Sequence, residues 1–115
     1  MEYLLLIYEN EKTWDTMPEA ERGAMFGEYM AFTEDIKKKG QYKGGNPLKP
    51  TATATTVRVK GGKTIATDGP FAETKEQLGG YYLVEAKDLD EAIALAARIP
   101  GARTGSIEVR PIQKM

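Results

Sequence analysis

The chain has 115 residues, of which 41% are hydrophobic and 29% are charged, the composition of an ordinary folded domain. Sixteen Lys and Arg residues nearly balance seventeen Asp and Glu residues, and the net charge of -1 provides no basic surface for nucleic acid. The absence of cysteine and histidine excludes disulfides, thiolate nucleophiles, Ser-His-Asp catalysis and the commonest transition-metal ligands. We therefore expect one domain over residues 1–115, with no nucleic-acid partner, no metal and no cofactor.

The chain begins with a run of apolar residues, Tyr3 to Tyr8 (YLLLIY), which is followed by polar Glu9, Asn10 and Glu11. Six residues are too few to span a bilayer, and the run lacks the basic flank and cleavage site of a signal peptide. Its length and aromatic content favour a β-strand that is covered on both faces. We expect a cytoplasmic protein with no membrane partner.

A helical period follows between Met17 and Gly40. Apolar residues recur there on one stripe, at Met25, Tyr29, Phe32 and Ile36. Pro18 suits the first turn of a helix, and Gly40 suits the position just after its last turn. Phe26 and Met30 lie about a quarter turn away from the stripe, which predicts a second apolar contact for this helix.

The middle of the chain predicts a loop and then a hairpin. Residues 41–50 are rich in Gly, Asn and Pro, as in a loop, whereas residues 51–60 (TATATTVRVK) have the composition of a strand. Gly61 and Gly62 form a two-residue turn, from which residues 63–67 return as a second strand. After DGPFAETKEQ, the pair Gly79 and Gly80 precedes a strand over residues 81–86. Such a pair marks a bulge or the close approach of another backbone.

Residues 88–99 predict a second long helix, with Asp88 as its N-cap and Glu91 in the matching position of a capping box. Pro100 and Gly101 end this helix, and residues 106–110 predict a last strand. The order is strand, helix, strand, strand, helix, strand. It predicts a ferredoxin-like βαββαβ domain of the α+β class, with a β-hairpin extension in its middle.

Two helices can cover only one face of such a sheet. The other face carries Tyr, Leu, Val and Thr side chains, and the burial of apolar surface contributes about 25 cal/mol per Å². The same face of a second copy is the simplest cover. We therefore expect a two-fold homodimer that forms through the open sheet face.

Four stretches of the sequence resemble the YCII-related family, and in particular its DGPF-domain type: TATATTVRV, TDGPFAETKEQLGGYYLVEA, DLDEAIALAARIP and SIEVRPI. The likeness extends to YLLLIY at the start and to FTEDIKKKG at the end of the first helix, so that it covers nearly the whole chain. The resemblance implies a small bacterial protein of the dimeric α+β barrel class, in which two ferredoxin-like units pack sheet to sheet.

The same resemblance implies less about activity, because most members of the family are uncharacterised. DGPF-type members are often encoded beside extracytoplasmic-function sigma factors, and a relative in the wider group resembles a dehydrochlorinase of chlorinated-aromatic breakdown. The wider group is thought to use a His-Asp pair in a cleft. This chain has no histidine, so that pair cannot be carried over to it.

Asp68, in the sequence DGPF, is the candidate catalytic acid or base. It ends a predicted strand, where loops commonly display functional side chains, and a carboxyl group in a cleft can accept a proton. The alternative is structural. In that case the Asp68 carboxylate bonds downstream amides, Gly69 takes a positive φ, Pro70 fixes the next φ, and Phe71 anchors the loop in the core.

Four further residues are candidates for ligand binding: Arg58, Glu73, Lys75 and Tyr82. Arg58 can hold a ligand carboxylate through two nitrogens, or it can form a salt bridge with Asp68. Lys75 can bind an anion and Glu73 can take a proton, although alternating charges after a turn are usually a solvated surface. Tyr82 and the tyrosine before it point to opposite faces of one strand, so one faces the helices and the other the dimer cavity.

These observations favour a dimer that binds or transforms a small organic molecule in a cleft near Asp68. The alternative is a non-catalytic dimeric module that acts through partners in sigma-factor-associated regulation. The missing histidine favours the module, whereas the ordered motif around Asp68 favours the ligand-binding protein.

Overall fold

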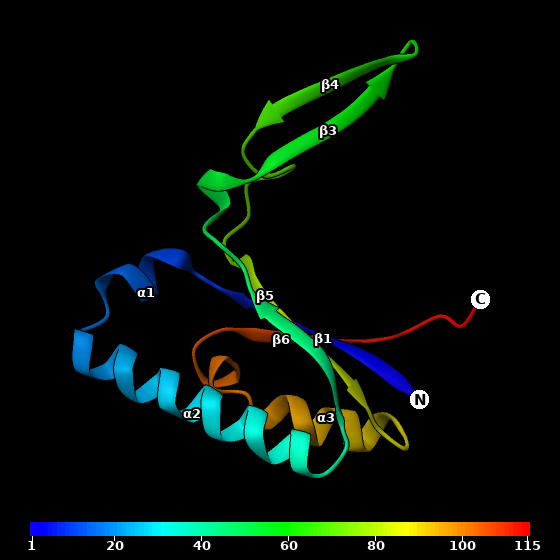
Figure 1. The fold of residues 1–115 in the computed structure, drawn as a ribbon. Coiled ribbons are helices and arrows are strands. Elements are labelled where there is room, and N and C mark those ends of the chain that lie inside the picture. The colour runs from blue at the N-terminus through cyan, green and yellow to red at the C-terminus, as the bar shows by residue number, and fades with distance from the viewer.

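The computed structural model describes residues 1–115 and contains three α-helices, six strands and two short 3-10 helices (Figure 1). The helices are α1 (Glu11–Thr16), α2 (Glu19–Lys38) and α3 (Leu89–Arg98), and the 3-10 helices are η1 (Thr51–Thr53) and η2 (Pro100–Arg103). The strands are β1 (Glu2–Glu9), β2 (Tyr42–Pro47), β3 (Thr55–Lys60), β4 (Lys63–Asp68), β5 (Gln77–Glu85) and β6 (Ser106–Pro111). None of the helices combines the length and the apolarity needed to cross a bilayer.

Four strands form an antiparallel sheet in the order β2-β5-β1-β6, and helices α2 and α3 lie together on one face of it (Figure 1). Helix α2 connects β1 to β2, which run parallel with β5 between them, and α3 connects β5 to β6, which run parallel with β1 between them. This is the ferredoxin-like arrangement. The prediction of a ferredoxin-like α+β domain is confirmed.

The second strand of that sheet is not where the sequence predicted it. Residues 42–47 were expected to be a loop, but they form the edge strand β2, which pairs with β5. Gly45 permits this pairing, because a Cβ atom at that position would lie 2.9 Å from the carbonyl oxygen of Tyr81. The glycine-rich composition therefore reflects a close approach between strands, which local propensity does not reveal.

The predicted hairpin exists, but it is shorter and lies outside the main sheet. Residues 51–53 form η1 after Pro50, and β3 begins only at Thr55. The turn residues Gly61 and Gly62 have φ values of 57° and 77°, as the two-residue turn requires. Strands β3 and β4 pair only with each other, so the hairpin is an insertion between β2 and β5.

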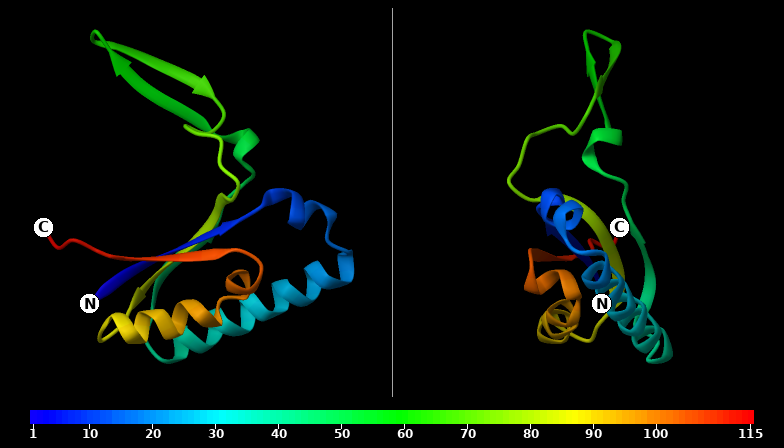
Figure 2. Two further views of the ribbon diagram at one scale, coloured as in Figure 1. Left: turned by 180° about the vertical axis from the view of Figure 1, so that it is seen from behind. Right: turned by 90° about the vertical axis from the view of Figure 1, so that its left-hand side faces the viewer.

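We call residues 55–68 the arm, because this hairpin projects away from the rest of the molecule in every view (Figures 1 and 2). The radius of gyration is 16.1 Å, compared with about 13 Å for a compact chain of this length. Val57 and Val59 share one face of the arm and are 60% and 67% exposed. The arm therefore carries β-branched side chains with no core of its own to bury them.

The core lies between the sheet and the two long helices. It contains twelve buried residues: Tyr3, Leu5, Ile7, Phe32, Ile36, Tyr82, Val84, Ala86, Ala92, Leu95, Ala96 and Ile99. The predicted stripe on α2 is confirmed, because Met25, Phe32 and Ile36 are buried and Tyr29 packs against the cluster. On α3, the buried residues are Ala92, Leu95 and Ala96, whereas Leu89 and Ile93 remain about half exposed.

Local signals at the ends of the elements are largely borne out. The Asp88 carboxylate accepts from the amide of Glu91 at 2.9 Å, and Gly40 ends α2 with a φ of 71°. The glycine pair before the predicted strand lies inside β5, where the register shifts between Gly80 and Leu78 at a β-bulge. Helix α1 is a further element that the sequence did not indicate.

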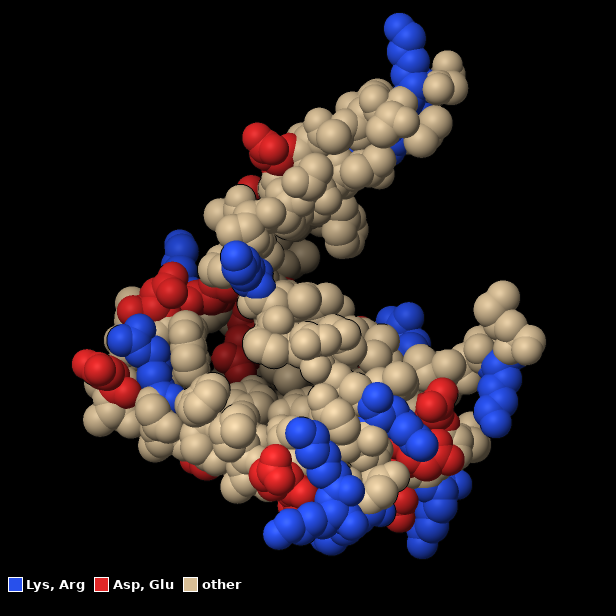
Figure 3. Space-filling view, in the orientation of Figure 1, with Lys and Arg blue, Asp and Glu red and all other residues tan.

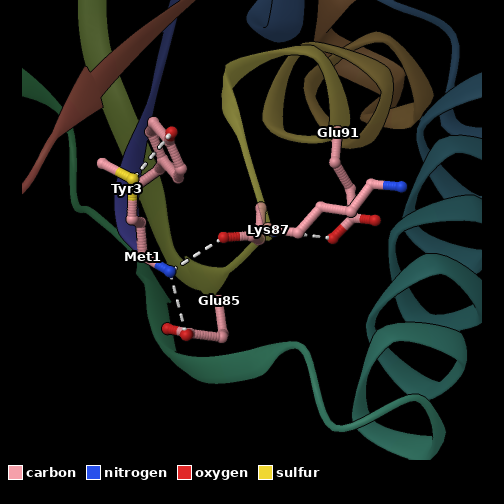
Figure 4. Close-up of polar contacts among 6 residues, drawn as sticks. Met1, Tyr3, Glu85, Lys87 and Glu91 are labelled. Carbon is pink, nitrogen blue, oxygen red and sulfur yellow. Dashed lines mark hydrogen bonds and ion pairs between the residues drawn. The ribbon is translucent and has the colours of Figure 1, made fainter.

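The start of β1 is fixed at the end of the sheet that lies away from the arm (Figure 4). The α-ammonium of Met1 donates to the Glu85 carboxylate at 3.0 Å and to the carbonyl of Ala86 at 2.9 Å. The ammonium group holds the pKa of Glu85 below its ordinary value. Beside it, the amide of Lys87 donates to the carboxylate of Glu91 at 3.1 Å, which orders the turn into α3.

Gly105 tests the packing between β1 and the turn before β6, and Gly23 in α2 is its control. A Cβ atom at Gly105 would lie 2.1 Å from the backbone oxygen of Tyr8, so Gly105→Ala must displace one of two paired strands. We expect the melting temperature to fall by about 5 °C or more. Gly23 is exposed in α2, and a Cβ atom there would meet nothing within 4 Å. Because alanine favours a helix more than glycine does, Gly23→Ala should raise the melting temperature by about 2–5 °C. Equal effects of the two substitutions in a thermal melt would contradict this packing.

Candidate functional site

A pocket of about 520 Å³ lies between helices α1 and α2 and the end of the sheet from which the arm leaves. Its lining comes from β1, α1, α2, β2 and β5 and from residues 48–50 at the base of the arm. In Figure 3 it is visible as a hollow beside the base of the arm, with acidic atoms in its depth. Six aromatic residues line it: Trp14, Phe26, Tyr29, Tyr42, Tyr81 and Tyr82.

Glu9, the last residue of β1, is one of the acidic residues that line this pocket. On β1, Tyr3, Leu5 and Ile7 face the helices, and Glu9 continues the same alternation at the strand's last residue. The bulge at this end of the pairing adds its extra residue to β5, so the alternation of β1 is not interrupted. Burial, opposed by a hydrogen bond from Thr104 and reinforced by the charge of Glu76, raises the pKa of Glu9 above its ordinary value.

The hydroxyl of Tyr29 lies next to this carboxyl group. It accepts a hydrogen bond from the amide of Gly101 at 3.1 Å, in the turn that follows α3. A Cβ atom at Gly101 would lie 2.5 Å from Oε1 of Glu9 and 2.8 Å from Oη of Tyr29, so both oxygens lie on one side of this glycine. Burial and the charge of Glu9 raise the pKa of Tyr29 strongly, and its hydroxyl therefore keeps its proton at all physiological pH values.

Tyr82 forms the wall of the pocket on the sheet. Its ring packs edge-to-face on Phe32 at 5.3 Å and on Tyr42 at 6.4 Å between ring centres. Thr33 donates its hydroxyl proton to the carbonyl of Tyr29 at 2.8 Å, so the contact of 2.7 Å between Thr33 and Tyr82 uses the tyrosine proton. Burial raises the pKa of Tyr82.

Helix α1 closes the pocket from the side of the arm. Asn10 caps it by accepting from the amide of Lys12 at 3.0 Å. The Glu11 carboxylate accepts from the amide of Thr51 at 2.8 Å and from the Thr51 hydroxyl at 2.9 Å. The Glu11 amide donates to the side chain of Gln77 at 3.0 Å. These bonds attach α1 to the base of the arm and to the start of β5.

Only one of the predicted functional residues lies in this pocket, and that residue is Tyr82. Asp68 is exposed at the end of β4, and its carboxylate accepts no hydrogen bond. Arg58 forms no salt bridge with Asp68, because their positions in the hairpin register differ: Arg58 opposes Ile65. Glu73 and Lys75 are exposed between the arm and β5. The structure does not bring these four residues together at the pocket, and their roles stay predictions.

The DGPF motif forms a turn, but one residue of it differs from expectation. Gly69 has the expected positive φ, at 100°, and the turn is closed by backbone groups: Gly69 donates to Ala54 and accepts from the Thr56 hydroxyl. Phe71, in contrast, is 78% exposed and does not anchor the loop in the core. The reason is that the motif follows the arm, which projects away from the core (Figure 2).

Glu9 and Trp14 are pocket residues that the sequence did not single out, and Tyr29 appeared in it only as a core residue. The period-two alternation of β1 was a usable signal for Glu9, since it places residue 9 on the same face as Ile7. The six-residue helix α1 left no comparable signal for Trp14. No group of three or more acidic residues lies close enough together to hold a metal ion.

The sequence pattern that defines the YCII-related domain matches residues 1–115. This chain belongs to the YCII-related family. An uncharacterized protein of Rhizobium meliloti (strain 1021) is 39% identical to it over 114 residues, which are 97% of this chain and 92% of the relative. The family assignment therefore agrees with the resemblance noted in the sequence.

Among solved structures, this YCII-related chain is similar to 5-chloro-2-hydroxyhydroquinone dehydrochlorinase from Burkholderia phenoliruptrix AC1100, in a complex with 2,5-dihydroxybenzoquinone. The TM-score is 0.57, and the match covers 98% of this chain and 94% of the enzyme. The sequences are 16% identical, so the likeness concerns the fold.

The raised pKa of Glu9 predicts how stability changes with pH. Because the folded-state pKa lies above the ordinary value of 4.5, ionisation of Glu9 opposes folding. This cost is absent below about pH 4 and fully present above the raised pKa. In Glu9→Gln the cost is removed. The variant should therefore melt at a higher temperature than the parent chain at pH 7, and the difference should disappear at pH 4. A difference that is independent of pH would contradict the burial of an ionised Glu9.

Proposed function

We propose that this YCII-related chain binds a small, mainly apolar organic molecule in the pocket between α1, α2 and the sheet. The observation that carries the proposal is the pocket itself. Its volume of about 520 Å³ lies within the range of small-molecule sites, and aromatic side chains with a few polar groups line it. Exposed Phe26 and Met30 are accounted for by this proposal, because both side chains line the pocket.

The polar groups suit either binding or proton transfer. Glu9 has a carboxyl group in surroundings that favour its protonated form, and such a group exchanges a proton closer to neutral pH than an ordinary glutamate. Tyr29 supplies a hydroxyl beside it. The similar fold of a dehydrochlorinase in complex with 2,5-dihydroxybenzoquinone supports a ligand of about the size of one ring. Neither the fold nor the relatives favour the alternative of a regulatory module.

We test ligand binding by blocking the pocket at its rim. Met30 is 50% exposed and lines the pocket, so Met30→Arg places a charged side chain in the space that an aromatic ring would occupy. A thermal-shift and NMR screen of small phenols, quinones, aryl alcohols and arylamines should find compounds that bind the parent chain with Kd of about 1 mM or tighter. Binding should weaken at least tenfold in Met30→Arg.

The control is Leu89→Arg on α3, which is similarly exposed and lies outside the pocket, and it should bind like the parent chain. The proposal is wrong if no compound in the screen binds. It is also wrong if Met30→Arg binds the hits as tightly as Leu89→Arg does.

We also propose that a second copy covers the open sheet face. Cross-strand neighbours on that face are apolar: Leu4 lies opposite Leu83, Leu6 lies opposite Tyr81, and Tyr8 follows on β1. No element of the chain lies over them (Figure 2). The exposed arm adds to the apolar surface, and an isolated two-stranded hairpin is only marginally stable without further packing. Both surfaces support a two-fold homodimer.

For the homodimer, light scattering at micromolar concentration should give twice the chain mass of 12.7 kDa. Leu6→Arg places a charge in the middle of the open face and should give a folded monomer, as judged by circular dichroism. Ile93→Arg, on the exposed side of α3, should remain a dimer. A parent chain that is monomeric under these conditions rules out this interface.

A further inference from the structure

The charge of the pocket differs from that of the chain as a whole. The chain is close to neutral, with a net charge of -1. Among the residues that line the pocket, Glu9, Glu11 and Asp15 are acidic and Lys49 is the one basic residue. The lining therefore carries two more negative than positive side chains. A ligand of positive charge would match it, and a ligand of negative charge would be repelled.

Glu9 is a half-buried acidic residue of this set, and it forms no salt bridge within the chain. The guanidinium of Arg103, whose charge acts on the neighbouring Tyr29, is paired with Glu28 at 2.7 Å. Glu76 adds a second negative charge near Glu9, and that carboxylate accepts from the hydroxyl of Ser106 at 2.9 Å. A partly buried carboxylate without a cation is costly to ionise, and a bound cation would remove much of this cost.

The other charged residues of the lining are occupied or exposed. Both oxygens of Glu11 accept hydrogen bonds from Thr51, and Asp15 and Lys49 are exposed to solvent. Glu9 is therefore the carboxylate that a bound molecule would meet inside the pocket. Lys49 lies on the outer loop at the base of the arm, where water screens its charge.

The aromatic side chains of the pocket also favour a ligand of positive charge. Five aromatic rings on the helix side of the sheet line this pocket, those of Trp14, Phe26, Tyr29, Tyr42 and Tyr82, whereas the Tyr81 ring points to the open sheet face. Aromatic rings present negative electrostatic potential at their faces, and clusters of them are the usual binding sites of substituted ammonium ions. The hydroxyl of Tyr29 accepts from Gly101, and the hydroxyl of Tyr82 donates to Thr33, so both are already engaged with the protein.

We propose that the ligand of this pocket is an organic cation: an amine whose ammonium group lies against Glu9 and whose apolar part, of about the size of one aromatic ring, lies among the aromatic side chains. This inference rests on the proposed function, since it names the class of the small molecule. It commits to a positive charge on the ligand, which a neutral phenol or quinone lacks.

The test uses three molecules of nearly equal shape: 2-phenylethylamine, 2-phenylethanol and 3-phenylpropionate. Isothermal titration at pH 8 and low salt should show the amine binding at least tenfold more tightly than the alcohol, with the carboxylate weakest. In Glu9→Gln, which keeps the size of the side chain, affinity for the amine should fall at least tenfold, and affinity for the alcohol should change less than threefold. Asp15→Asn is the control for charge at the exposed rim and should change amine affinity less than threefold.

Affinity for the amine should also rise with pH as Glu9 ionises, because the carboxylate attracts the ammonium and the neutral acid does not. Tyr29 and Tyr82 have raised pKa values and keep their protons in this range, so they do not produce the rise. The neighbouring carboxylate of Glu76 is present in both the parent chain and Glu9→Gln, so a comparison of the two isolates Glu9. The rise should be absent in Glu9→Gln.

The outcomes separate this inference from the proposal on which it rests. If the alcohol binds as tightly as the amine, or the carboxylate binds most tightly, the cation class is wrong while small-molecule binding in the pocket stands. If none of the three binds but phenols or quinones from the screen do, the cation class is again wrong. If the amine binds most tightly and equally in Glu9→Gln, the role of Glu9 is overturned.

Discussion

The contact between Tyr82 and helix α2 joins this helix to the sheet. The Tyr82 ring packs edge-to-face on Phe32, and its hydroxyl bonds Thr33 one residue further along the same helix. These two contacts hold the second half of α2 against the sheet, where Ile36 is fully buried. Phe26 and Met30 on the same helix have no such contact and are exposed, and the pocket lies between them, α1 and the sheet end. Tyr82 thus belongs both to the core and to the wall of the pocket beside it.

The remaining surfaces follow from a sheet that is covered on one side. Helices α2 and α3 pack on one face, and the opposite face keeps a row of leucine and tyrosine side chains. The insertion between β2 and β5 extends the molecule instead of covering that face, because β3 and β4 pair only with each other. Apolar area of this kind is costly to leave in water, and it is the physical basis for expecting a second copy.

Asp68 and Glu9 show that the position of a carboxylate in the fold matters more for its chemistry than the sequence motif around it. Asp68 belongs to the most distinctive stretch of the sequence, yet it is exposed to solvent at the base of the arm. Glu9 belongs to no motif, but it ends a buried strand near the hydroxyl of Tyr29. Desolvation there raises its pKa, and the aromatic lining favours a cation near it. The chemistry of the pocket follows from burial more than from residue type.

The sequence alone determined the class of fold, the stripe of α2, the cap at Asp88, the turn at Gly61 and Gly62, and the family, because each depends on residues close together in the chain or on a whole-chain pattern. It did not place β2, since a glycine-rich segment becomes a strand only where β5 lies alongside it. It did not locate the pocket, whose walls come from residues as far apart in the chain as Ile7 and Tyr82. It also did not show that Phe71 is exposed. Only the tertiary structure decides these features, because burial and electrostatic environment depend on which distant segments meet in space.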